Sequence, residues 1–254
     1  MAGIRDVLLE VKRLAKDNGL SEPYIVGGLP RDKILHRINK VEDIDITSGD
    51  ESVHQLAELA AQKFRVNPIR FPDGHYQLYI NKIKYDFSSN FNSPDAAYFL
   101  KKAGIKEPSS MLIELFSRDF TCNTLIIPLA LRKIVDPTGL AIDDIKKKII
   151  RTPLPPRITL RDDPKRVVRA IYLAAKLGFV VEEDITLWVL AHHDKIKEEV
   201  SVGFSRRKLA DATRADATKT MQLVTRMRLW NVIGIPKILQ QSMPVAQSAA
   251  QVAL

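Results

Sequence analysis

Cysteine and long apolar runs are the scarcest features of this 254-residue sequence. Cys122 is its single cysteine, which excludes an internal disulfide and a cysteine-based zinc site. No run approaches the roughly 18 apolar residues that a membrane-spanning helix needs, so an integral membrane protein is excluded. The N-terminal segment mixes acidic with apolar residues, unlike a secretory signal. We therefore expect a cytoplasmic protein whose chemistry uses oxygen and nitrogen groups.

The charge is unevenly distributed along the chain. Residues 1–145 carry 19 Lys/Arg and 20 Asp/Glu, whereas residues 146–254 carry 20 Lys/Arg and 10 Asp/Glu. The whole excess of positive charge lies in the second part, which favours a polyanionic partner such as a nucleic acid. A basic surface that only improves solubility explains the same count.

The hydrophobic pattern changes character about two thirds of the way along the chain. Helical spacing over residues 3–17 and 51–63 is mixed with short alternating strands, whereas only helical patterns occur from residue 162 to about 233. Asp162 is predicted as the N-cap of one of these helices. The sequence thus predicts an α+β fold with a small mixed sheet and helices, followed by an all-α part. We expect three segments: a domain over 1–150, a helical domain over 151–240, and an uncharged tail over 241–254 that is either frayed or the stub of a missing element.

Two carboxylates, Asp43 and Asp45, occupy alternate positions of a predicted strand and so share one face. Such carboxylates repel each other unless a cation lies between them. Asp86, on the corresponding face of another predicted strand, offers a third. Together they suit two Mg²⁺ ions, which prefer oxygen ligands and share them with phosphate. The alternative is a solvated strand face.

A glycine pair, Gly27 and Gly28, directly follows the predicted strand over residues 24–26, and Arg31 follows closely. Paired glycines let backbone N–H groups approach phosphate oxygens, and an arginine clamps them. An ordinary tight turn with a surface arginine explains the pair equally well when it is taken alone.

Five segments, in order, resemble motifs of the class II tRNA nucleotidyltransferases (CCA-adding enzymes) and bacterial poly(A) polymerases, within the DNA polymerase beta-like superfamily. GGLPRD with the later DID resembles the family's GGxVRD…DxD. SRDFTCNTL resembles RRDFTINAL, and DPTG with the later DDI resembles DPxGGxxDL. DDPKRVVRA resembles EDPLRxLRA and is followed by AAKLGF. The resemblance runs from about residue 22 to residue 180 and more weakly to about 240.

The resemblance implies a polymerase-beta-like nucleotidyltransferase head followed by a helical neck and body. It implies that Asp43, Asp45 and Asp86 are catalytic and hold the metal ions. It also implies that Asp163 and Arg166 select the incoming base by hydrogen bonds to its edge, in place of a nucleic-acid template. The residues that it assigns to nucleotide binding are Gly27, Gly28, Arg31, Arg118, Asp119, Asn123, Asp162, Asp163, Arg166 and Arg169.

The sequence departs from the family pattern at four positions. Pro30 replaces a valine, Asp162 replaces a glutamate, and Ser117 and Phe91 stand where the family has arginines. The two missing arginines weaken the case for strong triphosphate or primer binding. Little follows the helical region, so the resemblance implies a short form that lacks most of the body and tail helices.

The resulting hypothesis is a template-independent enzyme that extends RNA 3′ ends with Mg²⁺ as cofactor. Addition of C and A to the tRNA 3′ end from CTP and ATP, with release of pyrophosphate, is the first choice. Poly(A)-type ATP addition is the second, and addition of only part of CCA is a variant of the first. A non-catalytic RNA-binding descendant and a small-molecule nucleotidyltransferase are the alternatives from other classes.

Overall fold

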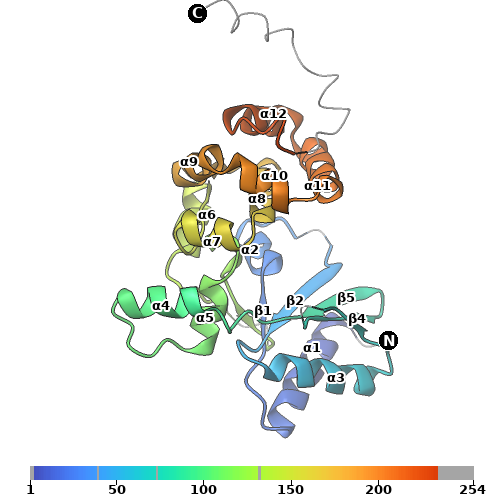
Figure 1. Ribbon diagram of the computed structural model, residues 1–254. Helices are drawn as coiled ribbons and strands as arrows, with labels where there is room; N and C mark the ends of the chain where they lie inside the picture. The colour runs from blue at the N-terminus through green and yellow to red at the C-terminus, as the bar shows by residue number, and fades with distance from the viewer. Residues whose placement is uncertain (1–2, 39, 73, 131–132, 234–254) are drawn as a thin grey trace, which may run out of the picture. The chain divides into compact units, whose positions relative to one another are not determined.

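The structure is a computed structural model that describes residues 3–38, 40–72, 74–130 and 133–233 (Figure 1). The predicted tail over 241–254 lies outside these residues. The chain divides into two compact units, the first formed by Met1–Lys147 with Arg151–Pro155 and the second by Lys148–Ile150 with Pro156–Leu254. Within the described ranges, no helix combines the length and the apolar character needed to cross a membrane.

A six-stranded mixed sheet with the order β3-β4-β5-β2-β1-β6 forms the centre of the first unit. Its strands are β1 (Tyr24–Val26), β2 (Asp43–Thr47), β3 (Ile69–Arg70), β4 (Tyr76–Ile80), β5 (Ile83–Phe87) and β6 (Ile127–Pro128). Its helices are α1 (Ile4–Asp17), α2 (Gly28–Ile34), α3 (Ser52–Phe64), α4 (Pro94–Lys102), α5 (Ser110–Phe116), the 3-10 helix η1 (Thr121–Asn123) and α6 (Ala141–Lys147). Strands β2 and β5 pair in parallel, and the other neighbours pair antiparallel. The predicted mixed sheet with helices is thus confirmed.

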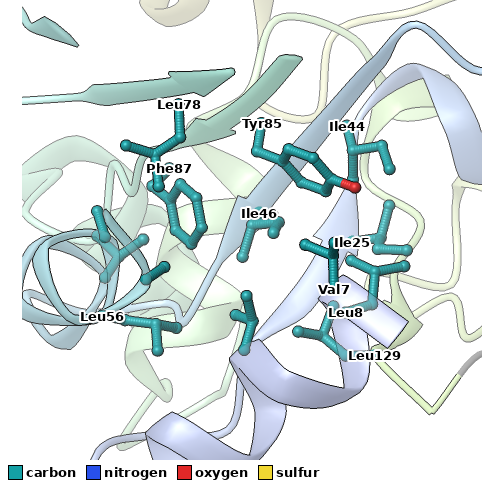
Figure 2. Packing of buried hydrophobic residues seen from close by; sticks show 14 of the residues in the cluster. Val7, Leu8, Ile25, Ile44, Ile46, Leu56, Leu78, Tyr85, Phe87 and Leu129 are labelled. Carbon is teal, nitrogen blue, oxygen red and sulfur yellow. The ribbon is translucent and has the colours of Figure 1, made fainter. Parts of the chain in front are cut away.

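The alternation of side chains along β2 and β5 divides the sheet into a buried face and a polar face. Ile44 and Ile46 of β2 and Tyr85 and Phe87 of β5 are almost completely buried. They pack with apolar residues of α1 and α3 into one core, which Figure 2 shows in close-up. Because successive side chains of a strand point to opposite faces, the acidic residues of both strands project away from this core.

The second unit is built around a long amphipathic helix, α8 (Lys165–Leu177), against which α11 and α12 pack. Its other helices are α7 (Pro156–Asp162), α9 (Glu183–Ala191), α10 (His193–Glu199), α11 (Val202–Ala215) and α12 (Ala217–Arg226). The predicted helical second part is confirmed. A short parallel pair, β7 (Ile149–Ile150) with β8 (Val180–Val181), accompanies these helices. Strands of two residues are too short to be predicted from the periodicity of apolar residues.

The prediction that Asp162 caps a helix is wrong. Asp162 is the last residue of α7, and α8 begins at Lys165 after Pro164. Proline disfavours the helical conformation of the residue before it, here Asp163, so α7 ends at Asp162. Asp163 Oδ1 instead accepts a hydrogen bond of 3.1 Å from the backbone N–H of Lys165.

The spacing of apolar residues after α8 predicts one helix over residues 183–200 and a second over 205–230 that is open to a break. The structure divides the first of these into α9 and α10, which separate at His192. The break that was expected within 205–230 falls at Asp216, whose side chain accepts a hydrogen bond from the N–H of Lys219 and so caps α12.

Candidate active site

Three carboxylates lie together on the polar face of the sheet, where β2 and β5 run side by side. The parallel register places Asp45 opposite Asp86 and Asp43 opposite Lys84. One oxygen from each of Asp43, Asp45 and Asp86 lies within 4.8 Å of the other two. The structure therefore brings together all three acidic residues that the sequence pattern selected, although Asp86 is 41 positions beyond Asp45 in the chain.

A lysine that the sequence reasoning gave no role, Lys84, lies inside this cluster. Its Nζ is 2.9 Å from Asp43 Oδ2 and 2.7 Å from Asp86 Oδ2. Gln77 of β4 donates a hydrogen bond of 2.8 Å to Asp86 Oδ1. The alternation along β5 places Lys84 on the same face as Asp86, but only the register with β2 shows that it reaches Asp43.

The carboxylates differ in their electrostatic environments. Burial raises the pKa of Asp45 from 3.8 to about 6, and the positive charge of Arg118 offsets part of this effect. Burial also raises the pKa of Asp43, against the opposing influence of Lys84. Burial disfavours the charged form of Lys84, but its hydrogen bonds to Asp86 and Asp43 outweigh this and raise its pKa. A buried carboxylate among like charges gains stability from a cation, so this all-oxygen set fits Mg²⁺.

A hollow of about 270 Å³ opens beside the carboxylates. Two histidines that the sequence reasoning did not select, His54 of α3 and His75 before β4, line it. The residues that line it are Asp45, His54, Gly74, His75, Asp86, Ser88, Ser89 and Asn90. No local sequence pattern identifies the two histidines as site residues, because they reach the hollow only through the tertiary fold.

The glycine turn after β1 lies directly against Asp45. Gly27 has φ +79, and a Cβ at this position would lie 2.3 Å from Asp45 Oδ2. A side chain is therefore excluded both by the left-handed backbone and by the carboxylate. Gly28 begins α2, and a Cβ there would lie 3.2 Å from an Nη atom of Arg31. The turn thus holds the backbone at Gly27 close to the Asp45 carboxylate.

Arg31 is buried, with 4% of its surface exposed. Its Nε donates to Asp32 Oδ1 at 2.8 Å, and its Nη1 donates to Asn123 Oδ1 at 2.6 Å. Asn123 Nδ2 in turn donates to Asp119 Oδ1 at 2.9 Å. The structure therefore joins Arg31, Asp119 and Asn123 into one buried network, which holds the start of α2 to the segment around η1.

Arg118, the other arginine predicted in the first unit, pairs with a buried carboxylate. Its Nη2 donates to Glu114 Oε1 at 2.7 Å, and Glu114 is fully buried. Ser117, which follows the last residue of α5, donates from its Oγ to the carbonyl oxygen of Glu114 at 2.7 Å. This hydroxyl therefore satisfies one of the last carbonyl groups of the helix. Glu114 was not predicted, because a single glutamate in an apolar helix resembles an ordinary surface residue.

The predicted base-selecting residues lie in the second unit. Arg166 Nε is 3.7 Å from Asp163 Oδ2, and Arg166 Nη1 donates to the carbonyl oxygen of Thr159 at 3.4 Å. Asp163 and Arg166 thus form an ion pair at the α7–α8 junction, although Asp163 lies outside both helices. Asp162 is paired with Arg161 at 2.9 Å, and Arg169 is exposed on α8.

The fold and the site define the class of protein. A small mixed sheet carries three carboxylates on adjacent parallel strands, a glycine turn lies against one of them, and a helical region follows. The family described as the poly A polymerase head domain matches residues 23–151, and the chain belongs to this family. The resemblance inferred from the motifs is confirmed.

Individual relatives agree with this assignment. The A-adding tRNA nucleotidyltransferase of Aquifex aeolicus is 33% identical over 164 residues, which cover 61% of this chain and 18% of the relative. The tRNA nucleotidyltransferase cca1 of Schizosaccharomyces pombe is 29% identical over 227 residues, covering 78% of this chain and 43% of the relative. The chain thus spans less than half of either curated relative.

A solved structure extends the similarity to the fold of the helical part. It is described as a tRNA nucleotidyltransferase complexed with a primer tRNA and an incoming ATP analog. It is 29% identical, with a TM-score of 0.69, over 91% of this chain and 66% of that one. The predicted combination of a nucleotidyltransferase head with a following helical region is therefore confirmed.

Proposed function

We propose that the chain carries a template-independent nucleotidyltransferase activity that adds C and A residues to the 3′ ends of tRNA, using CTP and ATP and releasing pyrophosphate. The observation that carries the proposal is the carboxylate cluster on β2 and β5 in a member of this family. The names of the relatives, and the primer tRNA and ATP analog bound by the solved tRNA nucleotidyltransferase, support tRNA and nucleotide as substrates. We also propose a cytoplasmic location, on the ground of the single, buried cysteine.

In this proposal Asp43, Asp45 and Asp86 hold two Mg²⁺ ions. When bound, Mg²⁺ supplies activation of the attacking 3′-hydroxyl and neutralisation of the leaving pyrophosphate. The carboxylates would place the α-phosphate through the cations that they hold, and the backbone N–H groups of Gly27 and Gly28 would donate hydrogen bonds to the phosphates. The network of Arg31, Asp119 and Asn123 positions α2 and so supports that turn.

Base selection is assigned to Asp163 and Arg166 on the second unit. A carboxylate accepts a hydrogen bond from the exocyclic amine of C or A, and a guanidinium donates to ring acceptors of the same edge. U and G present a carbonyl oxygen where C and A present the amine, so the pair discriminates against them. Arg118, Asp162 and Arg169 complete the proposed nucleotide-binding set, with Arg169 on the exposed face of α8.

RNA binding is assigned in part to the basic residues from position 146 onward, most of which belong to the second unit. Residues 146–254 carry ten more basic than acidic residues. Phosphate contacts by lysines and arginines release counterions, so the affinity for tRNA should fall steeply as salt rises.

Poly(A)-type addition is the second candidate, and the description of the matching family as a poly A polymerase head domain favours it. Addition of A alone is a third possibility, which the name of the Aquifex aeolicus relative favours. The three activities use the same carboxylate chemistry and differ in which nucleotides are accepted and when addition stops.

A primer-extension assay separates these activities. Purified protein with Mg²⁺ is given tRNA transcripts that end before CCA or after CC, with each nucleoside triphosphate alone and with CTP and ATP together. Two additions from CTP followed by one from ATP support CCA addition. A ladder from ATP alone indicates poly(A)-type synthesis, and a single A on the CC-ended transcript indicates A addition.

The non-catalytic alternative predicts a different result in the same assay. An RNA-binding descendant would bind tRNA without incorporating any nucleotide. Its RNA binding, and any biological effect, would also survive the substitution of Asp43 or Asp45 by alanine. A small-molecule nucleotidyltransferase would show no retention of tRNA in a filter-binding test.

A further inference from the structure

The carboxylate cluster contains its own cation. Lys84 contacts oxygens of both Asp43 and Asp86, at 2.9 Å and 2.7 Å. Its position follows from the backbone, because Lys84 is directly opposite Asp43 in the parallel register of β2 and β5. The backbone of the sheet therefore places Lys84 at the site, while its side chain stays free to move.

The oxygens that Lys84 contacts belong to the proposed metal ligands. Asp86 Oδ1 already accepts a hydrogen bond from Gln77 at 2.8 Å, so Oδ2 is the oxygen of Asp86 that faces Lys84. Two cations cannot share these oxygens at close range without strong repulsion. A divalent ion that binds Asp86 Oδ2 and Asp43 Oδ2 must therefore move the ammonium away.

Lys84 is able to make that movement. Its side chain is 27% exposed, so the ammonium can swing towards solvent on its flexible four-carbon stem. A lysine ammonium also has no carboxylate-matching fork that would hold it in place, unlike an arginine.

We propose that Lys84 is a resident competitor of the divalent metal ion, which holds Asp43 and Asp86 together before the ion binds and lowers the affinity of the site for it. The inference rests on the proposed function, since it takes the carboxylates as metal ligands. Lys84 thus acts on the metal through the ligands and is a positioning residue.

Binding of Mn²⁺, followed by the electron paramagnetic resonance signal of the free ion and without nucleotide or RNA, tests the proposal. The variant Lys84→Met keeps the length of the stem and removes the charge. Lys84→Gln serves the same purpose if the methionine variant does not give a native circular dichroism spectrum. Lys63→Met is the matched control, because Lys63 pairs with Glu10 at 3.0 Å on the other side of the sheet core, away from the carboxylates.

Loss of two charge-assisted contacts that oppose binding should tighten Mn²⁺ binding by roughly tenfold in Lys84→Met. Lys63→Met should remain within about threefold of the wild type. Lys84→Arg, whose fork holds the two carboxylates more firmly, should bind Mn²⁺ no more tightly than the wild type. Equal or weaker Mn²⁺ binding by both neutral variants, with the wild type binding normally, overturns the role of Lys84 and leaves the proposed function intact. Absence of Mn²⁺ binding in the wild type and in every Lys84 variant overturns the metal site itself, and with it both proposals.

Discussion

Replacing Asp45 with asparagine should stabilise the metal-free protein at neutral pH. Asp45 follows Ile44 and precedes Ile46 in β2 but projects from the opposite face of the sheet, and burial there raises its pKa from 3.8 to about 6. At 1.36 kcal/mol per pKa unit, keeping this carboxylate ionised in the folded state costs about 3 kcal/mol at pH 7. Partial solvent access reduces this, so we expect Asp45→Asn to increase the free energy of unfolding by roughly 1–3 kcal/mol.

The effect should depend on pH with a definite sign. Below the pKa of the unfolded chain Asp45 is protonated in both states and costs nothing. Between about pH 4 and pH 6 the folded state binds more protons than the unfolded state, so the stability of the wild type falls as the pH rises. The advantage of Asp45→Asn should therefore be near zero at pH 4 and complete above pH 7.

Urea unfolding followed by circular dichroism, with a chelator present, measures this difference at several pH values. Asp50→Asn is the control with the opposite sign, because hydrogen bonds from Ser21, Ser52 and Ser48 outweigh burial and lower the pKa of Asp50. That variant should lose stability at pH 7. An Asp45→Asn variant less stable than the wild type at pH 7, or an advantage that does not change with pH, would refute the reasoning.

Three further substitutions test the parts of the site around the carboxylates. Gly27→Ala should destabilise the protein by about 1–3 kcal/mol and weaken Mn²⁺ binding, since its Cβ would lie 2.3 Å from Asp45 Oδ2; unchanged melting and binding would contradict this. Asn123→Ala should lower the free energy of unfolding by about 2–3 kcal/mol in urea titrations, because Nη1 of the buried Arg31 loses its acceptor at 2.6 Å; an unchanged free energy would contradict this. Arg166→Ala should reduce the preference for CTP and ATP over UTP and GTP in single-nucleotide incorporation by roughly 10- to 100-fold, and an unchanged preference would remove Arg166 from base selection.

The sequence predicted the acidic cluster because it depends mainly on local alternation. The pattern of β2 places Asp43 and Asp45 on one face, and the pattern of β5 does the same for Asp86 and Lys84. What no local pattern contains is the pairing of β2 with β5, which are separated along the chain by a helix and two strands. The role of Lys84 depends on that register and was therefore missed.

The surroundings of the arginines were harder to predict for the same reason. Arg31 was expected to face phosphates, but the acceptor that holds it, Asn123, is 92 positions away. Glu114, which pairs with Arg118, is also outside the motif and lies in a short helix that periodicity did not detect. Asp162 was predicted as an N-cap because acidic residues favour that position, whereas it is the last residue of α7, which begins at Pro156.

Transfer of label from an α-labelled nucleoside triphosphate to the 3′ end of a tRNA transcript tests the central claim most directly. Wild-type protein should incorporate label only with Mg²⁺ or Mn²⁺ present, and Asp45→Asn should reduce the rate by roughly 100-fold or more while it keeps its fold and binds tRNA. Label transfer by Asp45→Asn at the wild-type rate would contradict the assignment of the carboxylates as the catalytic centre.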